Sequence, residues 1–313
     1  MRSVKYSGAG PASEVISITD IAIPTPGPGE VVVKVGAAGL NPVDVKIRAA
    51  ATDFGPIKYS DRPGWDVAGV VATVAPDVSA WSPGDRVFAL AAFPVAAHTL
   101  AEYAVVAAGD LAAAPDAWTI AQAGAAPLAA LTAWQALEAA AVGAGQRVLV
   151  LGGAGGVGHL AIQLAKAMGA EVTATASAAK HELLRSWGAD HVVDYRDEHG
   201  LASLNRVDAV IVTVDGTLPP RGTVTEGTAV ITITGLSADD SALLAEWGAA
   251  PVERILVAAS GGQLAEIAAL ADAGEVEVHL DSEFGLNELV AAQERVESGR
   301  VTGKVVVVID RDA

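Results

Sequence analysis

The feature that most constrains this chain is a glycine-rich turn that joins a short apolar run to an amphipathic run. Arg147 to Leu151 has the composition of a buried strand, and residues 159–168 carry apolar side chains at helical spacing. The turn between them has the spacing Gly-x-Gly-x-x-Gly, which in a strand-turn-helix context is the dinucleotide-binding fingerprint. Its residues are Gly153, Ala154, Gly155, Gly156, Val157 and Gly158.

Each glycine of this fingerprint has a mechanical role. We assign the tight turn to Gly153, the close approach of a pyrophosphate to Gly155, and the close packing of helix on strand to Gly158. The helix N-terminus offers N–H groups and a partial positive charge to phosphates. The turn therefore predicts a dinucleotide cofactor, and the plainer alternative is a turn with a structural role only.

The end of the next expected strand, Glu171 to Ala176, indicates which dinucleotide. Enzymes that prefer NAD usually place a carboxylate there for the ribose 2′-hydroxyl. This strand ends at Ser177, and Lys180 follows in the first turn of the next helix. A hydroxyl and an ammonium suit a 2′-phosphate, so we expect NADPH. The alternative roles are a helix N-cap for Ser177 and a solvated charge for Lys180.

The chain of 313 residues is longer than a single core usually supports, so two domains are expected. Residues 1–120 read as mostly β, with apolar runs divided by Pro and Gly turns. From about residue 120, helical segments alternate with Val- and Ile-rich strands, as in a parallel sheet. The fold class is therefore α/β. The later strands are expected at Arg147 to Leu151, Glu171 to Ala176, His191 to Asp194, Asp208 to Val214, Thr228 to Ile233 and Arg254 to Val257.

Composition excludes several classes of partner. The net charge of −17 and the pI near 4.6 argue against nucleic acid and anionic membranes. The chain has no cysteine, and its N-terminus lacks the apolar core of a signal peptide. We therefore expect a cytoplasmic protein.

Motifs along nearly the whole chain resemble the medium-chain dehydrogenase/reductase superfamily, in its zinc-independent quinone oxidoreductase and enoyl reductase branch. They are Ala38 to Arg48, Pro63 to Val71, Gly84 to Phe88, Ala101 to Tyr103, Leu131 to Leu137, Gly152 to Gly158, Trp187 to Asp190, Val193 to Tyr195 and Gly299 to Val308.

The resemblance implies a GroES-like β-rich catalytic domain, residues 1–121 completed by 275–313, and a Rossmann doubly wound domain, residues 122–274. It implies a homodimer through the edge strand near Arg254 to Val257. It adds Tyr195 to the 2′-phosphate site, where a half-buried aromatic is the alternative. It also implies further cofactor contacts, from Asn41 and Thr132 and from the backbone that lines the cofactor cleft at Val214, Gly235, Leu236 and Lys304. For Thr132 the alternative is a hydroxyl bonded to the backbone of its own helix.

Zinc members of this superfamily use a Cys in the first motif and a His-Glu pair in the second. Here Asn41 and Trp65-Asp66 stand at those places, and the six histidines show no pair at ligand spacing. We therefore expect no metal, and alcohol oxidation loses its Lewis acid.

Hydride transfer to a quinone or to an alkene conjugated to a carbonyl needs no metal. Asn41 is the first candidate for a hydrogen bond to such an acceptor or to the nicotinamide ribose, and a turn residue before Pro42 is the alternative. Lys46 is a candidate for stabilising a developing anion, and a charge on a solvated strand or helix face is the alternative. Tyr59 is a candidate proton donor, and solvent is another.

Two other functions stay open. One is reduction of enoyl thioesters in a biosynthetic pathway, and the other is a non-catalytic NADPH-binding sensor. We also expect the helix between Asp215 and Gly227 to be curtailed, because the segment is short and contains Pro219-Pro220.

Overall fold

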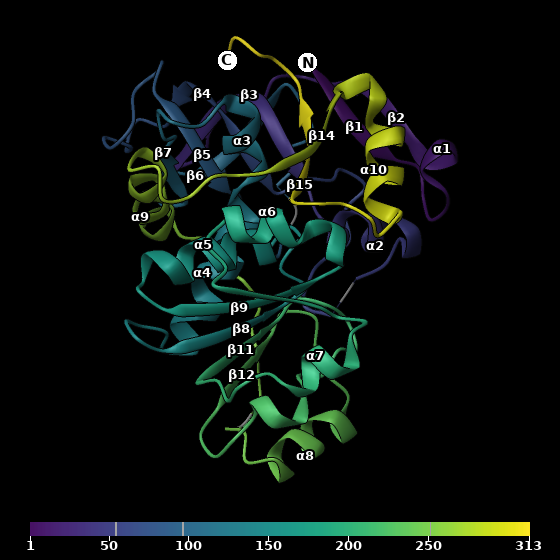
Figure 1. The fold of residues 1–313 in the computed structure, drawn as a ribbon. Coiled ribbons are helices and arrows are strands. Elements are labelled where there is room, and N and C mark those ends of the chain that lie inside the picture. The colour runs from purple at the N-terminus through teal and green to yellow at the C-terminus, as the bar shows by residue number, and fades with distance from the viewer. Residues whose placement is uncertain (54, 96, 251) are drawn as a thin grey trace. The chain divides into compact units, whose positions relative to one another are not determined.

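The structure is a computed structural model that describes residues 1–53, 55–95, 97–250 and 252–313. The chain forms two compact units (Figure 1). Unit 1 consists of Met1–Leu131, Ala258–Gly274 and Val278–Ala313, and unit 2 consists of Thr132–Val257 and Glu275–Glu277. Both chain ends thus lie in unit 1, and unit 2 is inserted between them.

Unit 1 is built on a seven-stranded sheet in the order β14-β15-β3-β4-β5-β7, with β6 paired to β3. Its strands are β3 (Glu30–Leu40), β4 (Asp66–Val74), β5 (Arg86–Leu90), β6 (Tyr103–Ala107), β7 (Leu111–Ala113), β14 (Leu280–Gly285) and β15 (Lys304–Val308). A second sheet pairs β1 (Arg2–Tyr6) with β2 (Ile16–Asp20). The helices that lie wholly in unit 1 are α1 (Ala12–Val15), α2 (Pro42–Ala50), α3 (Ile120–Ala125), α9 (Gly261–Asp272) and α10 (Leu289–Glu297).

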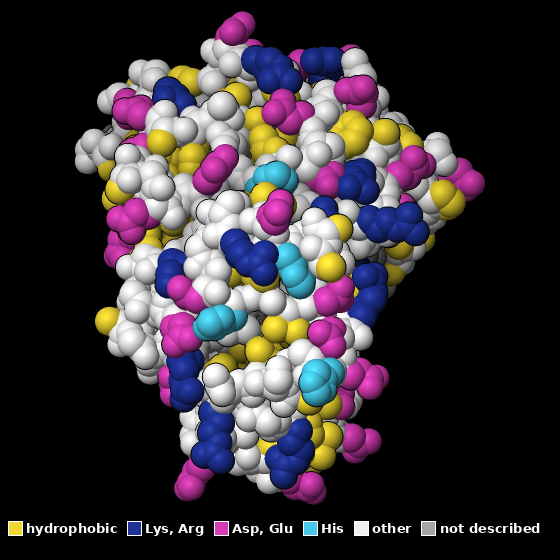
Figure 2. Space-filling view, in the orientation of Figure 1, with side chains coloured by type: hydrophobic (Ala, Val, Ile, Leu, Met, Phe, Trp, Pro, Cys, Tyr) yellow, Lys and Arg dark blue, Asp and Glu magenta, His cyan; other side chains and the backbone are white. Residues whose placement is uncertain are grey.

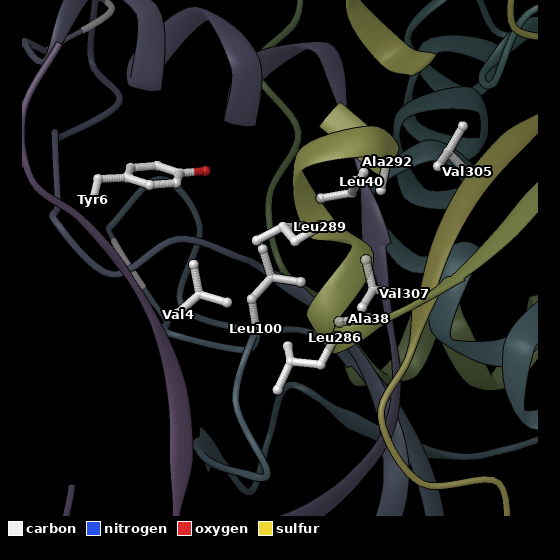
Figure 3. Packing of buried hydrophobic residues seen from close by; sticks show 10 residues of the cluster. All are labelled: Val4, Tyr6, Ala38, Leu40, Leu100, Leu286, Leu289, Ala292, Val305 and Val307. Atoms are coloured by element: carbon white, nitrogen blue, oxygen red, sulfur yellow. The ribbon is translucent and has the colours of Figure 1, made fainter. Parts of the chain in front are cut away.

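The last strand, β15, is buried along its whole length, because helices cover both of its faces. Alternate side chains of a strand point to opposite faces. Val305 and Val307 pack with Leu289 and Ala292 of α10 in one apolar cluster (Figure 3). Helix α3 also contacts β15. A valine-rich strand with no polar alternation is what this double cover requires.

Unit 2 is a parallel sheet in the order β10-β9-β8-β11-β12-β13. Its strands are β8 (Arg147–Leu151), β9 (Glu171–Ala176), β10 (His191–Asp194), β11 (Ala209–Val212), β12 (Ala229–Thr232) and β13 (Glu253–Arg254). Numbered along the chain within this unit, the strands have the order 3-2-1-4-5-6, which defines the doubly wound dinucleotide-binding fold. The expected Rossmann sheet is confirmed.

The helices of unit 2 follow its strands in the chain. They are α5 (Gly158–Ala167), α6 (His181–Ser186), α7 (Glu198–Ala202) and α8 (Ala238–Glu246), and α4 (Pro127–Ala139) begins in unit 1 and continues into unit 2. Unit 2 also has short 3₁₀ turns, η1 (Ala178–Lys180) and η2 (Arg221–Thr223), and another, η3 (Leu286–Glu288), lies in unit 1. Between Asp215 and Gly227 the only helical residues are those of η2, so the expected shortening is confirmed.

Residues 258–274 differ from the expected domain division, which placed them in the Rossmann domain. Helix α9 belongs to unit 1. Hydrogen bonds join its two ends to residues on either side of β7. The Gly261 N–H donates to the Gly109 carbonyl at 3.2 Å, and the Asp272 carboxylate accepts from the Ala117 N–H at 2.9 Å. An alternation of helices and strands along the chain does not reveal such a return to the first unit.

Candidate active site

The turn after β8 begins one residue earlier than the fingerprint. Gly152 has a φ of +83°, and a Cβ there would lie 2.4 Å from Cγ2 of Val214. The φ of Gly153, in contrast, is not positive. A Cβ on it would lie 3.0 Å from the side chains of Ala174, Ile162 and Leu184, so its role is close packing. The assignment of the tight turn to Gly153 is therefore wrong, and Gly152 makes it.

The start of α5 fits the pyrophosphate of a dinucleotide. Among the described residues, the N–H groups of Ala154, Gly156 and Val157 donate to no backbone carbonyl. They precede a ten-residue helix, whose N-terminus carries partial positive charge. A Cβ on Gly155 would meet nothing closer than the Gly152 carbonyl oxygen at 3.4 Å. Free donors and an open approach are the features that bind phosphate oxygens.

The ends of β9 and β10 bring together the residues expected around a 2′-phosphate. Ser177 occupies the N-cap position of η1, and Lys180 is the last residue of this turn. The Asp194 carboxylate joins the two strand ends, since it accepts from the Ala178 N–H and from the Arg196 N–H, each at 2.9 Å. Tyr195, the residue between Asp194 and Arg196 in the chain, is 52% exposed.

Arg196 is a residue that the sequence did not single out. Its guanidinium lies 4.6 Å from the centroid of the Tyr195 ring, a cation-π distance. The signal that could have identified it is its position directly after Tyr195, where a second cation would help hold a phosphate.

Apart from Thr132, the remaining expected cofactor contacts of unit 2 follow the carboxyl ends of strands. Val214 follows β11 and lies against Gly152. The Gly235 N–H donates to Oγ1 of Thr232 at 3.0 Å, and Leu236 comes next. Thr132 is buried in α4. In doubly wound sheets, ligands bind at this edge where the strand order reverses, here between β8 and β11.

A buried polar cluster in unit 1 joins the first motif, the second motif and the tail. The Nδ2 group of Asn41 donates to Oδ2 of Asp66 at 2.8 Å, and the Lys304 ammonium donates to Oδ1 of Asn41. Lys304 also donates to the Leu40 carbonyl at 3.2 Å, and its Nζ lies 3.6 Å from Oδ2 of Asp66. The Leu128 N–H donates to Oδ1 of Asp66 at 2.6 Å. All three side chains are at least 97% buried, so these hydrogen bonds replace the water they have lost.

The charges of this cluster oppose their own burial. Burial raises the pKa of Asp66, and the Lys304 ammonium together with N–H donors from Asn41 and Leu128 acts against that rise. Burial likewise lowers the pKa of Lys304, and the carboxylates of Asp66 and Asp44 act against it. The Lys304 ammonium donates its hydrogen bonds to oxygens of the protein. The expected contact of Lys304 with a cofactor therefore stays a prediction, and it concerns the backbone of this residue.

Asp44 lies beside the cluster in the first turn of α2. Its Oδ2 accepts from the Asn41 N–H at 2.9 Å, whereas its buried Oδ1 has no hydrogen-bond partner. Burial raises the pKa of Asp44 to about 7, and the nearby Asp66 carboxylate adds to the rise. A cavity of about 10 Å³, near the lower limit for holding one water molecule, is lined by Asp44, Tyr6 and Trp65 among others.

The other two catalytic candidates are more exposed. Lys46 is exposed on α2, and Tyr59 is partly exposed and donates its N–H to Asp53 at 2.8 Å. Arg48, from the same segment, is instead 1% exposed and paired with Glu297. The structure assigns Arg48 a role in joining α2 to α10. It does not test the proposed catalytic roles of Lys46 and Tyr59.

Metal ligands are not grouped in the part of the chain that the structure describes. None of its sets of His, Asp and Glu side chains is placed to hold a metal ion, and the sequence has no cysteine. At the two motifs compared above with zinc sites, the buried Lys304 ammonium contacts the Asn41 amide and the Asp66 carboxylate. Acidic and basic side chains are interspersed over the face shown in Figure 2. No helix among the described residues is long and apolar enough to cross a membrane.

Comparisons with known proteins agree with this architecture. Residues 27–116 match the alcohol dehydrogenase GroES-like domain, and residues 187–307 match a family described as zinc-binding dehydrogenase. The chain is 35% identical to a 2-methylene-furan-3-one reductase of Solanum lycopersicum, over 98% of this chain and 79% of that protein. It is 34% identical, with the same two coverages, to an NADPH-dependent alkenal/one oxidoreductase of Arabidopsis thaliana.

Among solved structures, the quinone oxidoreductase from Coxiella burnetii superposes with a TM-score of 0.86 at 30% identity and covers 99% of both chains. The fold, the fingerprint and these relatives define a two-domain oxidoreductase with a nucleotide-binding sheet. The chain belongs to the medium-chain dehydrogenase/reductase superfamily, in its quinone oxidoreductase and enoyl reductase branch.

Proposed function

We propose that this protein uses NADPH, without a metal, to reduce a quinone or an alkene conjugated to a carbonyl. The observation that carries the proposal is the Asn41-Asp66-Lys304 cluster, which puts a buried ammonium and an amide where a zinc enzyme has metal ligands. The names of the relatives, reductases of a methylene-furanone, of alkenals and enones, and of quinones, support the acceptor class.

The choice of NADPH over NADH rests on the ends of β9 and β10. At the end of β9 the chain offers a hydroxyl from Ser177 and a cation from Lys180, and no carboxylate follows there directly. The nearby Asp194 carboxylate accepts two backbone N–H groups, which stabilise its charge. The guanidinium of Arg196 adds positive charge beside Tyr195.

The residues divide the work as follows. The N–H groups at the start of α5 would hold the pyrophosphate, and Ser177, Lys180 and Tyr195 would hold the 2′-phosphate. The bound nicotinamide would supply the hydride. Asn41 would donate a hydrogen bond to the acceptor's oxygen, where negative charge develops. Tyr59 or solvent would supply the proton, and Lys46 stays a candidate for stabilising the anion.

Other properties rest on the coarser findings. The relatives support a nicotinamide cofactor and a small-molecule acceptor for this chain. The homodimer through the edge of β13 and the cytoplasmic location stay predictions, and so does the absence of nucleic-acid or membrane partners.

The test mixes purified protein with NADPH and a panel of quinones, enones and enoyl thioesters, and follows the absorbance of the reduced cofactor. Turnover of quinones or enones is expected. Turnover of enoyl thioesters alone would move the assignment to biosynthetic enoyl reduction. NADPH binding without turnover of any acceptor would indicate a sensor.

A further inference from the structure

The Asn41 amide has more hydrogen-bonding capacity than the protein uses. Its oxygen accepts from Lys304, and one of its two N–H groups donates to Asp66. Among the described residues no acceptor pairs with the second N–H. Since Asn41 is only 2% exposed, an unpaired N–H there is costly unless a ligand supplies an oxygen.

Only one orientation of this amide is compatible with its two neighbours. An ammonium has donors and no acceptor, and an ionised carboxylate has acceptors and no donor. Rotating the amide by half a turn would set its NH₂ against the Lys304 ammonium and its oxygen against the Asp66 carboxylate. Both hydrogen bonds would then be replaced by repulsion.

The strands hold the three groups in this arrangement. Leu40 of β3 pairs with Val305 of β15, and these neighbours of Asn41 and Lys304 appear together in Figure 3. Asp66 begins β4, which also pairs with β3. The lysine is therefore fixed by the sheet register and by its bond to the Leu40 carbonyl.

We propose that Lys304 is a positioning residue, which fixes the Asn41 amide so that its second N–H points as a donor to the oxygen of the acceptor. This inference rests on the proposed function. In that reaction the reduced cofactor would supply a hydride, so that one of its C–H bonds is exchanged for a C–H bond on the acceptor. The acceptor's π electrons would move to its oxygen, which would then take a proton from Tyr59 or from solvent. The Asn41 N–H stabilises that oxygen while it is charged.

The experiment compares Lys304→Met, Lys304→Arg, Asn41→Ala and the double variant Lys304→Met/Asn41→Ala. Lys34→Met is the matched control, because Lys34 is a partly exposed lysine of the same unit, paired with Asp310. The rate of acceptor reduction, kcat, is measured along with the affinity for NADPH. We expect Lys304→Met and Asn41→Ala each to lower kcat by 10-fold or more with little change in NADPH affinity. The double variant should be no slower than Asn41→Ala, and Lys304→Arg should recover part of the rate.

A second measurement does not depend on turnover. Heteronuclear NMR of isotope-labelled protein resolves the two side-chain amide protons of Asn41, assigned by their loss in Asn41→Ala. In the wild type, the proton bound to Asp66 should be shifted downfield and slow to exchange. Lys304→Met should remove that signature, and Lys304→Arg should keep it.

The outcomes separate this inference from the proposed function. A wild type that reduces no acceptor refutes the proposed function, while the NMR result still judges the amide orientation. A wild type that turns over, with rate losses that multiply in the double variant or with an unchanged amide signal in Lys304→Met, refutes the role of Lys304. If Lys304→Met does not fold, Lys304→Arg decides: a wild-type rate with the amide signature lost, or a lost rate with the signature kept, refutes it too.

Discussion

A Cβ atom on Gly158 would lie 2.2 Å from the carbonyl oxygen of Gly152. No real Cβ approaches an oxygen so closely, so the first residue of α5 must be a glycine for the helix to pack against the end of β8. Gly155, in the same turn, has its nearest neighbour at 3.4 Å, an ordinary contact. The two glycines therefore act on different properties, one on packing and the other on the approach of a ligand.

Gly158→Ala should destabilise the protein, and Gly155→Ala should not. Overpacking of this kind costs about 1–3 kcal/mol of the free energy of unfolding. Gly155→Ala should keep the stability and weaken NADPH binding, because its methyl group would lie where the pyrophosphate approaches. Denaturant unfolding and a fluorescence titration with NADPH measure the two effects. Equal stability losses in both variants would contradict this division of roles.

Lys180→Ala should weaken NADPH binding selectively. Loss of a charge-assisted contact to the 2′-phosphate costs on the order of 1.4 kcal/mol, about 10-fold in Kd. NADH lacks this phosphate, so its Kd is the internal control and should not change. Titration of wild type and variant with both cofactors decides the matter. Unchanged Kd values for both cofactors would make Lys180 a solvated surface charge, and an equal loss for NADH and NADPH would show that it does not act on the 2′-phosphate.

The sequence predicted what depends on local pattern. The strands of unit 2 were found because short Val- and Ile-rich runs are bounded by turn residues, and β8, β9 and β10 have the expected limits. Strand β11 is shorter than expected at both ends. At its carboxyl end, Thr213 turns its hydroxyl to the Leu151 carbonyl at 2.7 Å.

What depends on distant partners could not be predicted in the same way. Asn41 and Lys304 are 263 positions apart, and neither segment carries a sign of the other. For Asp66 the sequence predicted only that it stands where zinc members of the superfamily have a ligand. Lys46 and Arg48 are both basic and two residues apart, yet one is exposed and the other buried. The periodicity of a nine-residue helix did not show which of them faces the core.

Removal of metal should leave the activity unchanged. The described residues include no set of His, Asp and Glu that could hold a metal ion, and the chain has no cysteine. Acceptor reduction is measured before and after dialysis against a chelator, with metal analysis of the protein. Loss of activity on chelation, restored by zinc alone, would overturn the metal-free assignment.

The raised pKa of Asp44 should make stability fall as the pH rises. Its pKa is about 7 in the folded protein and 3.8 as an ordinary aspartate, so between these values the folded state binds more protons than the unfolded state. The stabilisation is complete below about pH 4 and is lost progressively up to about pH 7, a change on the order of a few kcal/mol. The charged groups that act on Asp44 are Asp66 and Lys304, and the neutral Tyr6 hydroxyl is coupled to it as well.

Asp44→Asn isolates this contribution from the other titrating groups. An asparagine oxygen can still accept the Asn41 N–H, so the first turn of α2 keeps its hydrogen bond. The free energy of unfolding is measured from denaturant curves at several pH values for both proteins. The difference between wild type and variant should change steadily from about pH 4 to pH 7 and be flat above it. Two parallel curves would mean that Asp44 is already ionised in the folded protein, with its Oδ1 paired to a buried water or a cation.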